Sequence, residues 1–271
     1  LALHVRANGA VAYEALRIKS DGNVIIGSGG SWSYPKALNV QGSSGSILSL
    51  YNADTTTYAA NTTSAIEFKL LTGNTGNQSG SCEIRAFKEN GTNGNNARAL
   101  SFYTGGNGGS PSEKLRITSD GEVTKPNNPR FQAYMSGTHF QISGGSNNIA
   151  YNTEVYDVGS NYNTSNGRFT APVDGAYYFQ HCLQVRKALS GTGVIEAKVW
   201  VIPVGGSATE RIRDYKEVIA TNMSGRAFGV LQLNAGDQVY PAYYSGINPT
   251  YVQNNGGNTP LTSFFEGYLV G

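Results

Sequence analysis

The sequence predicts an all-β protein, and three observations carry this prediction. Of the 271 residues, 35 are glycine and 26 are asparagine, and both types favour tight turns over helix interiors. Aromatic residues make up 11% of the chain, whereas disordered chains are poor in them. Asp-Gly and Gly-Gly pairs recur between short runs of β-forming residues. We therefore expect many short strands joined by tight turns.

The first 125 residues contain a near-repeat. Residues Glu14–Val24 read EALRIKSDGNV and residues Glu113–Val123 read EKLRITSDGEV. Each copy predicts a strand, an Asp-Gly turn and a second strand, because Asp-Gly between β-forming residues favours a two-residue turn with positive φ at both positions. Polar loops separate such units, and large apolar residues are few. Residues 1–125 therefore predict a repetitive β shaft whose strands stack or intertwine with neighbours.

A change in composition predicts a second domain. Lys125–Pro129 reads KPNNP, which is typical of a linker with nothing to bury, so we place the second domain at residues 130–271. Turn signals such as Asp174-Gly175 and the run NAGD at residues 234–237 separate the β-forming runs, which favours a β-sandwich or barrel. The strands expected there are Arg130–Tyr134, Ala176–Arg186, Val194–Val204, Arg211–Ile219, Ala227–Leu233, Gln238–Tyr244 and Ser263–Val270.

Alternation in one of these strands predicts its buried face. In the run YYFQHCLQV from Tyr177 to Val185, every second side chain shares a face of the strand. That face carries Phe179 and His181, so both are expected in the core, His181 as a hydrogen-bonded core group and not as a metal ligand. Phe169, before the preceding turn, is expected in the core as well.

The second domain has the residue spacing of a known family. The residues at matching positions are Tyr151, Asp157, Tyr162, Phe169, Gly175, Tyr177 and Phe179. Together with the endings Leu231–Val239 and Ser263–Leu269, this pattern resembles the C1q family over roughly residues 130–271. Tyr151 stands where Phe is usual, and His181 stands where Phe or Tyr is usual. The resemblance implies a ten-stranded jelly-roll head that assembles as a tight homotrimer.

The repeated element Leu-Arg-Ile-x-Ser-Asp-Gly-x-Val resembles the shaft element of bacteriophage tail fibres. Ala65–Phe68, Glu83–Asn90 and Ala99–Tyr103 resemble the segment between such elements. A trimeric shaft with a C1q-like jelly-roll knob implies the distal, receptor-binding part of a tail fibre, which attaches the virion to a host cell-surface receptor, a polysaccharide in our hypothesis. Because the chain begins with Leu1, we expect a longer polypeptide whose N-terminal part contacts other tail or virion proteins.

Two other functions stay open at this point. One is a secreted or cell-surface C1q-like adhesion protein, although the collagen-like Gly-X-Y stalk that would favour it is missing from the sequence. The other is a trimeric polysaccharide-degrading enzyme. The sequence contains no GxSxG, P-loop, HExxH or CxxC motif, and its carboxylates are sparse. We therefore expect a binding protein and not an enzyme.

The net charge, the hydropathy and the placement of histidine and cysteine limit the kinds of partner and cofactor that we expect. The net charge of +2 gives little support to nucleic-acid binding, and no apolar run approaches the ~18 residues of a membrane span. His4, His139 and His181 lie in three unrelated contexts, so no metal or other cofactor is expected. Cys82 and Cys182 are expected as free thiols, buried or half-buried.

The longest loop of the second domain is the candidate for receptor binding. The resemblance puts both termini of the head at its base, which puts the loop Gly246–Leu261 at its apex. Tyrosine rings with amide donors and acceptors suit sugars, which present C–H faces ringed by hydroxyl groups. A solvated, mobile loop is the alternative for any one residue. The residues expected to bind the receptor are Tyr243, Tyr244, Asn248, Tyr251, Gln253, Asn254 and Asn255.

Overall fold

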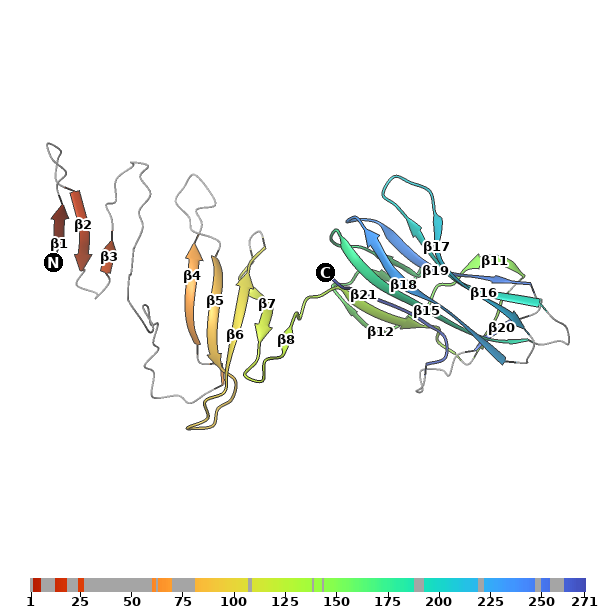
Figure 1. The fold of residues 1–271 in the computed structure, drawn as a ribbon, viewed down its shortest axis with the longest axis horizontal. Helices are drawn as coiled ribbons and strands as arrows, with labels where there is room; N and C mark the ends of the chain where they lie inside the picture. The colour runs from red at the N-terminus through yellow and green to blue at the C-terminus, as the bar shows by residue number, and fades with distance from the viewer. Residues whose placement is uncertain are drawn as a thin grey trace. The chain divides into compact units, whose positions relative to one another are not determined.

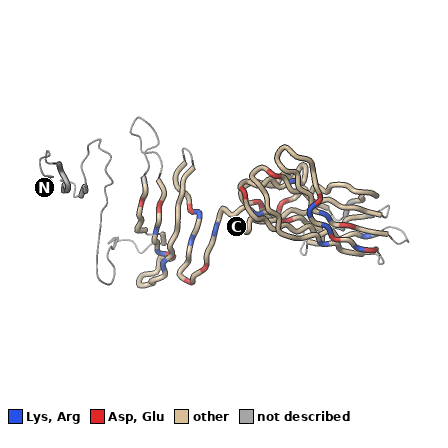
Figure 2. The backbone as a smooth tube through the Cα atoms, turned by 45° about the horizontal axis from the view of Figure 1, so that its top comes forward, with Lys and Arg blue, Asp and Glu red and all other residues tan. Residues whose placement is uncertain are grey.

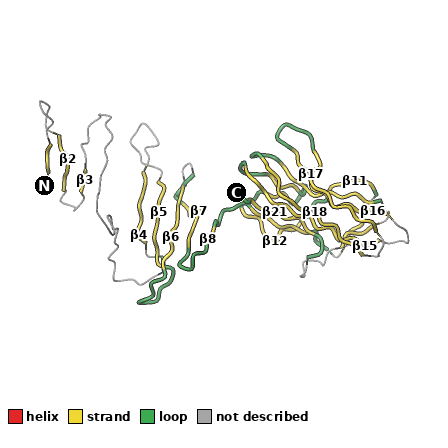
Figure 3. The backbone as a smooth tube through the Cα atoms, in the orientation of Figure 1, coloured by secondary structure: helices red, strands yellow, loops and turns green. Residues whose placement is uncertain are grey.

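The computed structural model confirms the all-β prediction. All of its elements are strands, β1 to β21 (Figures 1 and 3), and no helix occurs among the described residues. The structure describes residues 2–5, 13–18, 24–26, 60–61, 63–69, 81–106, 109–137, 139–142, 144–187, 193–218, 222–246, 250–253 and 261–271.

The chain divides into two compact units. One consists of Leu1–Ile66 with Arg85–Arg98, and the other of Glu67–Ile84 with Ala99–Gly271. The first contains an antiparallel sheet in the order β1-β2-β3, formed by Ala2–Val5, Tyr13–Ile18 and Val24–Ile26. The division at Lys125–Pro129 that the sequence suggests stays a prediction.

A five-stranded sheet follows along the chain in the order β4-β5-β6-β7-β8. Sequential order means that each strand pairs with its chain neighbour, as expected for a series of hairpins. The strands are β4 (Thr63–Lys69), β5 (Ser81–Lys88), β6 (Arg98–Thr104), β7 (Ser112–Ile117) and β8 (Val123–Thr124).

Both copies of the near-repeat form a hairpin in the same register. Ile18 pairs with Val24 in the first copy, and Ile117 pairs with Val123 in the second. The identical pairing follows from the identical spacing of the two segments. This confirms the two paired strands that were predicted for each copy.

The turn of the second hairpin differs from the two-residue turn that was predicted. The amide of Gly121 donates to the carbonyl of Thr118 (3.0 Å), and the amide of Thr118 donates to the carbonyl of Glu122 (2.9 Å). Only Gly121 takes the left-handed conformation, with φ of +83°. A type I turn followed by a left-handed glycine closes a three-residue loop, so Asp120 needs no positive φ. The turn of the first copy lies outside the described residues.

The head, residues 130–271, is a sandwich of two antiparallel sheets. The β15 sheet has the order β10-β20-β15-β21-β9-β12, with β18 on the other edge of β15; the β16 sheet has the order β13-β14-β19-β16-β17, with β11 beside β19. Their strands are β9 (Arg130–Tyr134), β10 (His139–Ile142), β11 (Gly145–Asn148), β12 (Thr153–Val158), β13 (Tyr162–Asn163), β14 (Arg168–Thr170), β15 (Gly175–Lys187), β16 (Gly193–Ile202), β17 (Thr209–Val218), β18 (Asn222–Leu233), β19 (Gln238–Ser245), β20 (Thr250–Gln253) and β21 (Phe264–Leu269).

Aromatic side chains fill the space between the two sheets. Phe169, Tyr177 and Phe179 are fully buried, as predicted, and the Phe169 ring contacts both others at centroid distances of 5.7 and 5.6 Å. Rings packed edge to face gain about 0.5–1.5 kcal/mol per pair beyond their burial. The aromatic core therefore holds the two sheets together and fixes the scaffold on which the outer faces are displayed.

Candidate functional site

Both ends of the head's chain lie at one end of the sandwich. The amide of Leu269 donates to the carbonyl of Pro129 (2.9 Å), and the Asn128 side chain donates to the carbonyl of Leu269 (2.8 Å). We call this end the base. The strands β11 and β20 lie at the opposite end, remote from the C-terminus, which we call the apex (Figure 1). Side chains near β20 are therefore the ones that the head presents farthest from its own termini.

The structure separates the three predicted receptor-binding tyrosines. Tyr243 is 4% exposed and belongs to the core, so in the single chain it offers no surface to a receptor. Tyr244 follows it on β19 and consequently faces outward from the β16 sheet, because successive side chains of a strand alternate. Tyr251 lies on β20, in the β15 sheet. The two outward tyrosines thus lie on different sheets and do not form one site.

Of the remaining four predicted residues, the structure describes only the backbone of Gln253. Asn248, Asn254 and Asn255 lie outside the described residues. Gln253 ends β20, where its backbone pairs with His139, and its side chain lies outside the described part. The proposal that these amides bind a receptor is therefore untested by the structure.

The segment Gly246–Leu261, predicted as one long loop, contains the strand β20. β20 pairs with β10 on one side and with the apical end of β15 on the other. The side chain of Val252 is fully buried in the core, which places Tyr251 on the opposite, outward face. The prediction of an uninterrupted loop is wrong here, because the short run TYVQ pairs with a strand on each side, β10 and the longer β15.

Tyr251 lies in a row of side chains that crosses four strands, which we call the Tyr251 row. Register pairs Gln141 of β10 with Tyr251, Tyr251 with Arg186 of β15, and Arg186 with Asn222 of β18. Tyr251 is half-buried and the other three are exposed. Directly opposite side chains in antiparallel strands lie about 4.5–5.5 Å apart at Cβ. An aromatic ring, two amides and a guanidinium are therefore held side by side on a sheet.

Sequence reasoning missed Gln141, Arg186 and Asn222. They come from segments as far apart as residues 141 and 222, and only the register of β10, β20, β15 and β18 aligns them with Tyr251. The alternation of Tyr251 and Val252 could have indicated a strand, but nothing local indicates its partners. The row is a product of tertiary pairing.

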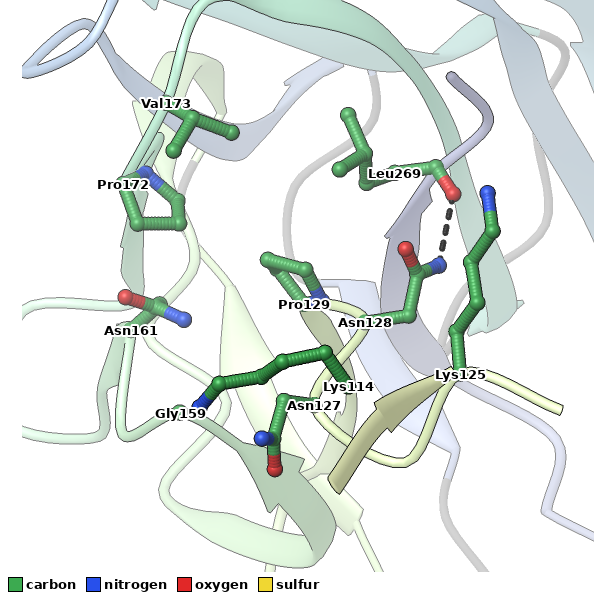
Figure 4. Close-up of a pocket in the computed structure, with 10 residues that line it drawn as sticks. All are labelled: Lys114, Lys125, Asn127, Asn128, Pro129, Gly159, Asn161, Pro172, Val173 and Leu269. Atoms are coloured by element: carbon green, nitrogen blue, oxygen red, sulfur yellow. Dashed lines mark hydrogen bonds between the residues drawn. The ribbon is translucent and has the colours of Figure 1, made fainter. Parts of the chain in front are cut away.

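A hollow of about 410 Å³ lies at the base (Figure 4). Val173, Pro172 and Leu269 give it an apolar wall, and Lys114 and Lys125 contribute its only charged side chains. Its lining contains no carboxylate, histidine or cysteine. This hollow therefore holds no acid–base pair and no nucleophile.

His181 is buried in the core, as predicted. Its Nδ1 lies 3.0 Å from the carbonyl oxygen of Lys198, and its Nε2 lies 3.1 Å from the hydroxyl oxygen of Tyr151. Burial lowers the pKa of His181 to about 4, because the charged ring would lose its hydration. The ring is therefore neutral at physiological pH.

The described residues contain few groups with reactive chemistry. No cluster of three or more His, Cys, Asp or Glu side chains suited to a metal occurs among them. Both cysteines are free thiols; Cys182 is buried, whereas Cys82 is exposed and not half-buried as expected.

Within the described part of the chain, no helix is long and apolar enough to cross a membrane. Acidic and basic positions are interspersed along the backbone (Figure 2).

Comparison with known proteins finds one protein family and several solved structures. A family model described as C1q domain matches residues 131–270. Among solved structures, the globular domain of zebrafish complement 1qA protein is 19% identical, over 53% of this chain and 98% of that one, with a TM-score of 0.39. Murine APRIL is 12% identical, over 53% of this chain and 99% of that one, with a TM-score of 0.40. Eiger TNF from S. frugiperda is 11% identical, over 54% of this chain and 94% of that one, with a TM-score of 0.41.

Proposed function

The chain belongs to the C1q family through residues 131–270, and on this premise we propose that it is the distal, receptor-binding part of a bacteriophage tail fibre. In this role the head binds a host cell-surface glycan and the shaft carries the head. The observation that carries the proposal is the Tyr251 row, which presents polar and aromatic groups at the apex of the head. A fibre tip needs its binding groups at the end remote from its connection.

The chemistry of the Tyr251 row suits a sugar. The tyrosine ring offers an apolar face to C–H groups, and the Gln141 and Asn222 amides can both donate to and accept from hydroxyl groups. Arg186 adds five N–H donors in a fixed plane. Because the row lies on paired strands, the backbone positions that carry these groups are fixed before the ligand arrives, which reduces the entropy cost of binding.

The shaft assignment rests on the two hairpins of identical register. In the second hairpin, Leu100 pairs with Ile117 and Ile117 pairs with Val123, and all three are exposed in the single chain, by 36% to 61%. A row of exposed apolar side chains on a sheet is unusual for a protein that acts alone. Packing against two further copies of the chain would bury it, which supports a trimeric shaft.

The head also exposes apolar surface on the outer face of the β15 sheet. Val230 of β18 pairs with Tyr178 of β15, and Tyr178 pairs with Tyr268 of β21, where the two tyrosine rings lie 5.2 Å apart. Val230 and the neighbouring Phe228 are each 60% exposed. The proposed homotrimer covers this face and leaves the Tyr251 row, farther toward the apex, to the receptor.

The experiment that tests the function is competition for host cells. The fluorescently labelled chain should stain bacteria that a phage carrying this gene infects, and excess unlabelled chain should reduce adsorption of that phage. Antibodies raised against the chain should label the phage tail. If they label a bacterial or animal cell surface and no virion, the chain is a cell-surface adhesion protein instead. New reducing ends in host polysaccharide incubated with the chain would show a degrading enzyme.

A further inference from the structure

The outer face of the β16 sheet buries two charged side chains. Glu196 and Lys198 alternate on β16 with the core residues Ile195, Ala197 and Val199, and therefore point away from the core. Yet they are only 8% and 6% exposed. Lysine and glutamate are almost never this buried unless they are paired. Neighbouring side chains on the same outer face must therefore cover them.

A network of four charged groups accounts for this burial. Lys198 Nζ lies 2.7 Å from a carboxylate oxygen of Glu196 and 3.2 Å from one of Glu210. Nε of Arg213 lies 2.7 Å from Oε1 of Glu210, and its Nη1 lies 3.5 Å from Oε1 of Glu196. Two carboxylates and two cations balance to zero net charge. Removing charges from water costs about as much as a good ion pair regains, so stability alone is a weak reason for such a network.

Two tyrosines stand on either side of this network. Register places Glu196 between Tyr215 of β17 and Tyr244 of β19. Tyr215 is 54% exposed, Tyr244 is half-buried, and Lys198 Nζ lies 5.7 Å from the centroid of the Tyr244 ring. The outer face thus has aromatic side chains at both sides and hydrogen-bonding groups of fixed geometry between them.

The aromatic surface continues two residues farther along β16. Trp200 lies beside Tyr240 of β19, with ring centroids 6.3 Å apart and planes 22° from parallel. Trp200 is half-buried, while its indole nitrogen is fully buried and has no hydrogen-bond partner. What the ring leaves exposed is therefore carbon, which suits the C–H face of a pyranose ring.

We propose that this outer face is a second saccharide-binding site, specific for neutral glycans. We call it the flank site and define it by Glu196, Lys198, Glu210, Arg213, Tyr215 and Tyr244. Glu210 and Arg213, whose side chains are 22% and 52% exposed, can accept from and donate to sugar hydroxyls, with bonds stronger than those between neutral groups. The buried Glu196 and Lys198 hold these two side chains in position. Because the four charges balance, the network favours neither an acidic nor a basic ligand. The flank site lies on the other sheet from the Tyr251 row; as an attachment site it rests on the proposed function.

Binding to an oligosaccharide array tests the flank site. The array carries neutral oligosaccharides and sialylated or uronic-acid ones, and the full chain is applied as wild type, Tyr215→Ala and Tyr251→Ala. The matched control is Val204→Ala, because Val204 is 69% exposed and lies in a turn at the base. Since Tyr215 is itself more than half exposed, its truncation should leave the melting temperature unchanged. Tyr244→Ala serves as a second variant at the opposite wall.

The flank site predicts a defined pattern on this array. Wild type and Val204→Ala should bind a set of neutral oligosaccharides, and Tyr215→Ala should lose about tenfold in apparent affinity for part of that set, equivalent to about 1.4 kcal/mol. Tyr251→Ala should still bind that part. The proposal is overturned if Tyr215→Ala and Tyr244→Ala bind every oligosaccharide as wild type does, or if only acidic oligosaccharides are bound.

The same variants separate this proposal from the proposed function. If Tyr251→Ala alone loses both oligosaccharides and host cells, the flank site is overturned and the receptor-binding role stands. If the flank variants lose neutral oligosaccharides while wild type stains no host cell, the flank site stands and the attachment role is overturned. If wild type binds neither oligosaccharides nor cells, both are overturned.

Discussion

The hydroxyl group of Tyr151 and Nε2 of His181 lie 3.1 Å apart inside the head, both fully buried. Tyr151 and His181 are the two residues that depart from the residue pattern of the family, and their side chains form a hydrogen bond with each other. The carbonyl of Lys198, 3.0 Å from Nδ1, can only accept, so Nδ1 carries the proton and Nε2 accepts from Tyr151. The pair therefore satisfies both polar groups within an aromatic core.

A double-mutant cycle should detect this bond. Tyr151→Phe leaves Nε2 of His181 buried without a donor, which should cost about 1–3 kcal/mol of unfolding free energy. His181→Phe removes the partner of the Tyr151 hydroxyl, which keeps only a 3.3 Å contact to the carbonyl of Cys182. The double variant, with the residues usual in the family, should be destabilised by less than the sum of the two. Strict additivity in urea unfolding would contradict the pairing.

The buried imidazole predicts a loss of stability in acid. The folded pKa of His181, about 4, lies below its ordinary value of 6.5. The folded state therefore binds a proton less readily than the unfolded state. The stabilising contribution of the neutral His181 ring to the free energy of unfolding is complete above pH 6.5 and is lost as the pH falls toward 4. A shift of this size corresponds to about 3 kcal/mol. Urea unfolding at pH 7 and pH 4.5 should show a smaller drop for Tyr151→Phe/His181→Phe than for wild type; equal drops would contradict this assignment.

Gly267→Ala should destabilise the head. A Cβ at this position of β21 would lie 2.5 Å from Cδ1 and 2.7 Å from Cε1 of Phe179, which is fully buried and cannot move aside. Overpacking of this kind typically costs about 1–3 kcal/mol. Gly206→Ala, where the new Cβ stays 3.3 Å or more from its neighbours, is the control. A melting temperature unchanged by Gly267→Ala would show that the close approach of β21 to Phe179 is not needed.

Phe228→Asp should weaken the proposed homotrimer. Phe228 is 60% exposed in the single chain, so a charge there is harmless to the monomer but would be buried unpaired in an interface. Light scattering at low micromolar concentration should give a trimer for wild type and a monomer for Phe228→Asp. Val204→Asp, at the exposed turn of the base, should remain trimeric. A monomeric wild type, or a Phe228→Asp trimer, would contradict the interface.

The long strands of the head could be predicted because their signal is local. In β15 the alternation through Tyr177, Phe179 and His181 extends over many residues, and the structure confirms the face that it assigns to the core. The same alternation, applied to Tyr243 and Tyr244, would have shown that adjacent residues of a strand cannot both face a receptor. The error was to assign both residues to the receptor site although both lie in the predicted strand Gln238–Tyr244.

The short apical strands could not be predicted from their own residues. β10, β11 and β20 have four residues each, and β11 reads GSNN, which is typical of a turn. β20 and β11 are strands because β15 and β19 extend past their other partners and leave backbone groups to be paired, and β10 in turn pairs with β20. The Tyr251 row depends on these pairings, so its members were beyond the reach of sequence patterns except Tyr251 itself.

Replacing the segment Gly246–Leu261 by a short linker would not be a clean test of receptor binding. The segment contributes Val252 to the core and pairs β20 with β15, so its removal would damage the fold. Single changes at exposed members of the Tyr251 row avoid this difficulty. Arg186 and Gln141 both qualify.

Adsorption of the full chain to host cells is the measurement that tests the central claim most directly. Wild type, Tyr251→Ala, Arg186→Ala and the control Val204→Ala should share one trimeric mass and one melting temperature. We predict that wild type and Val204→Ala adsorb equally, and that Tyr251→Ala and Arg186→Ala each lose about tenfold in affinity, equivalent to about 1.4 kcal/mol. Adsorption of both row variants at wild-type strength would contradict the assignment of receptor binding to the apex of the head.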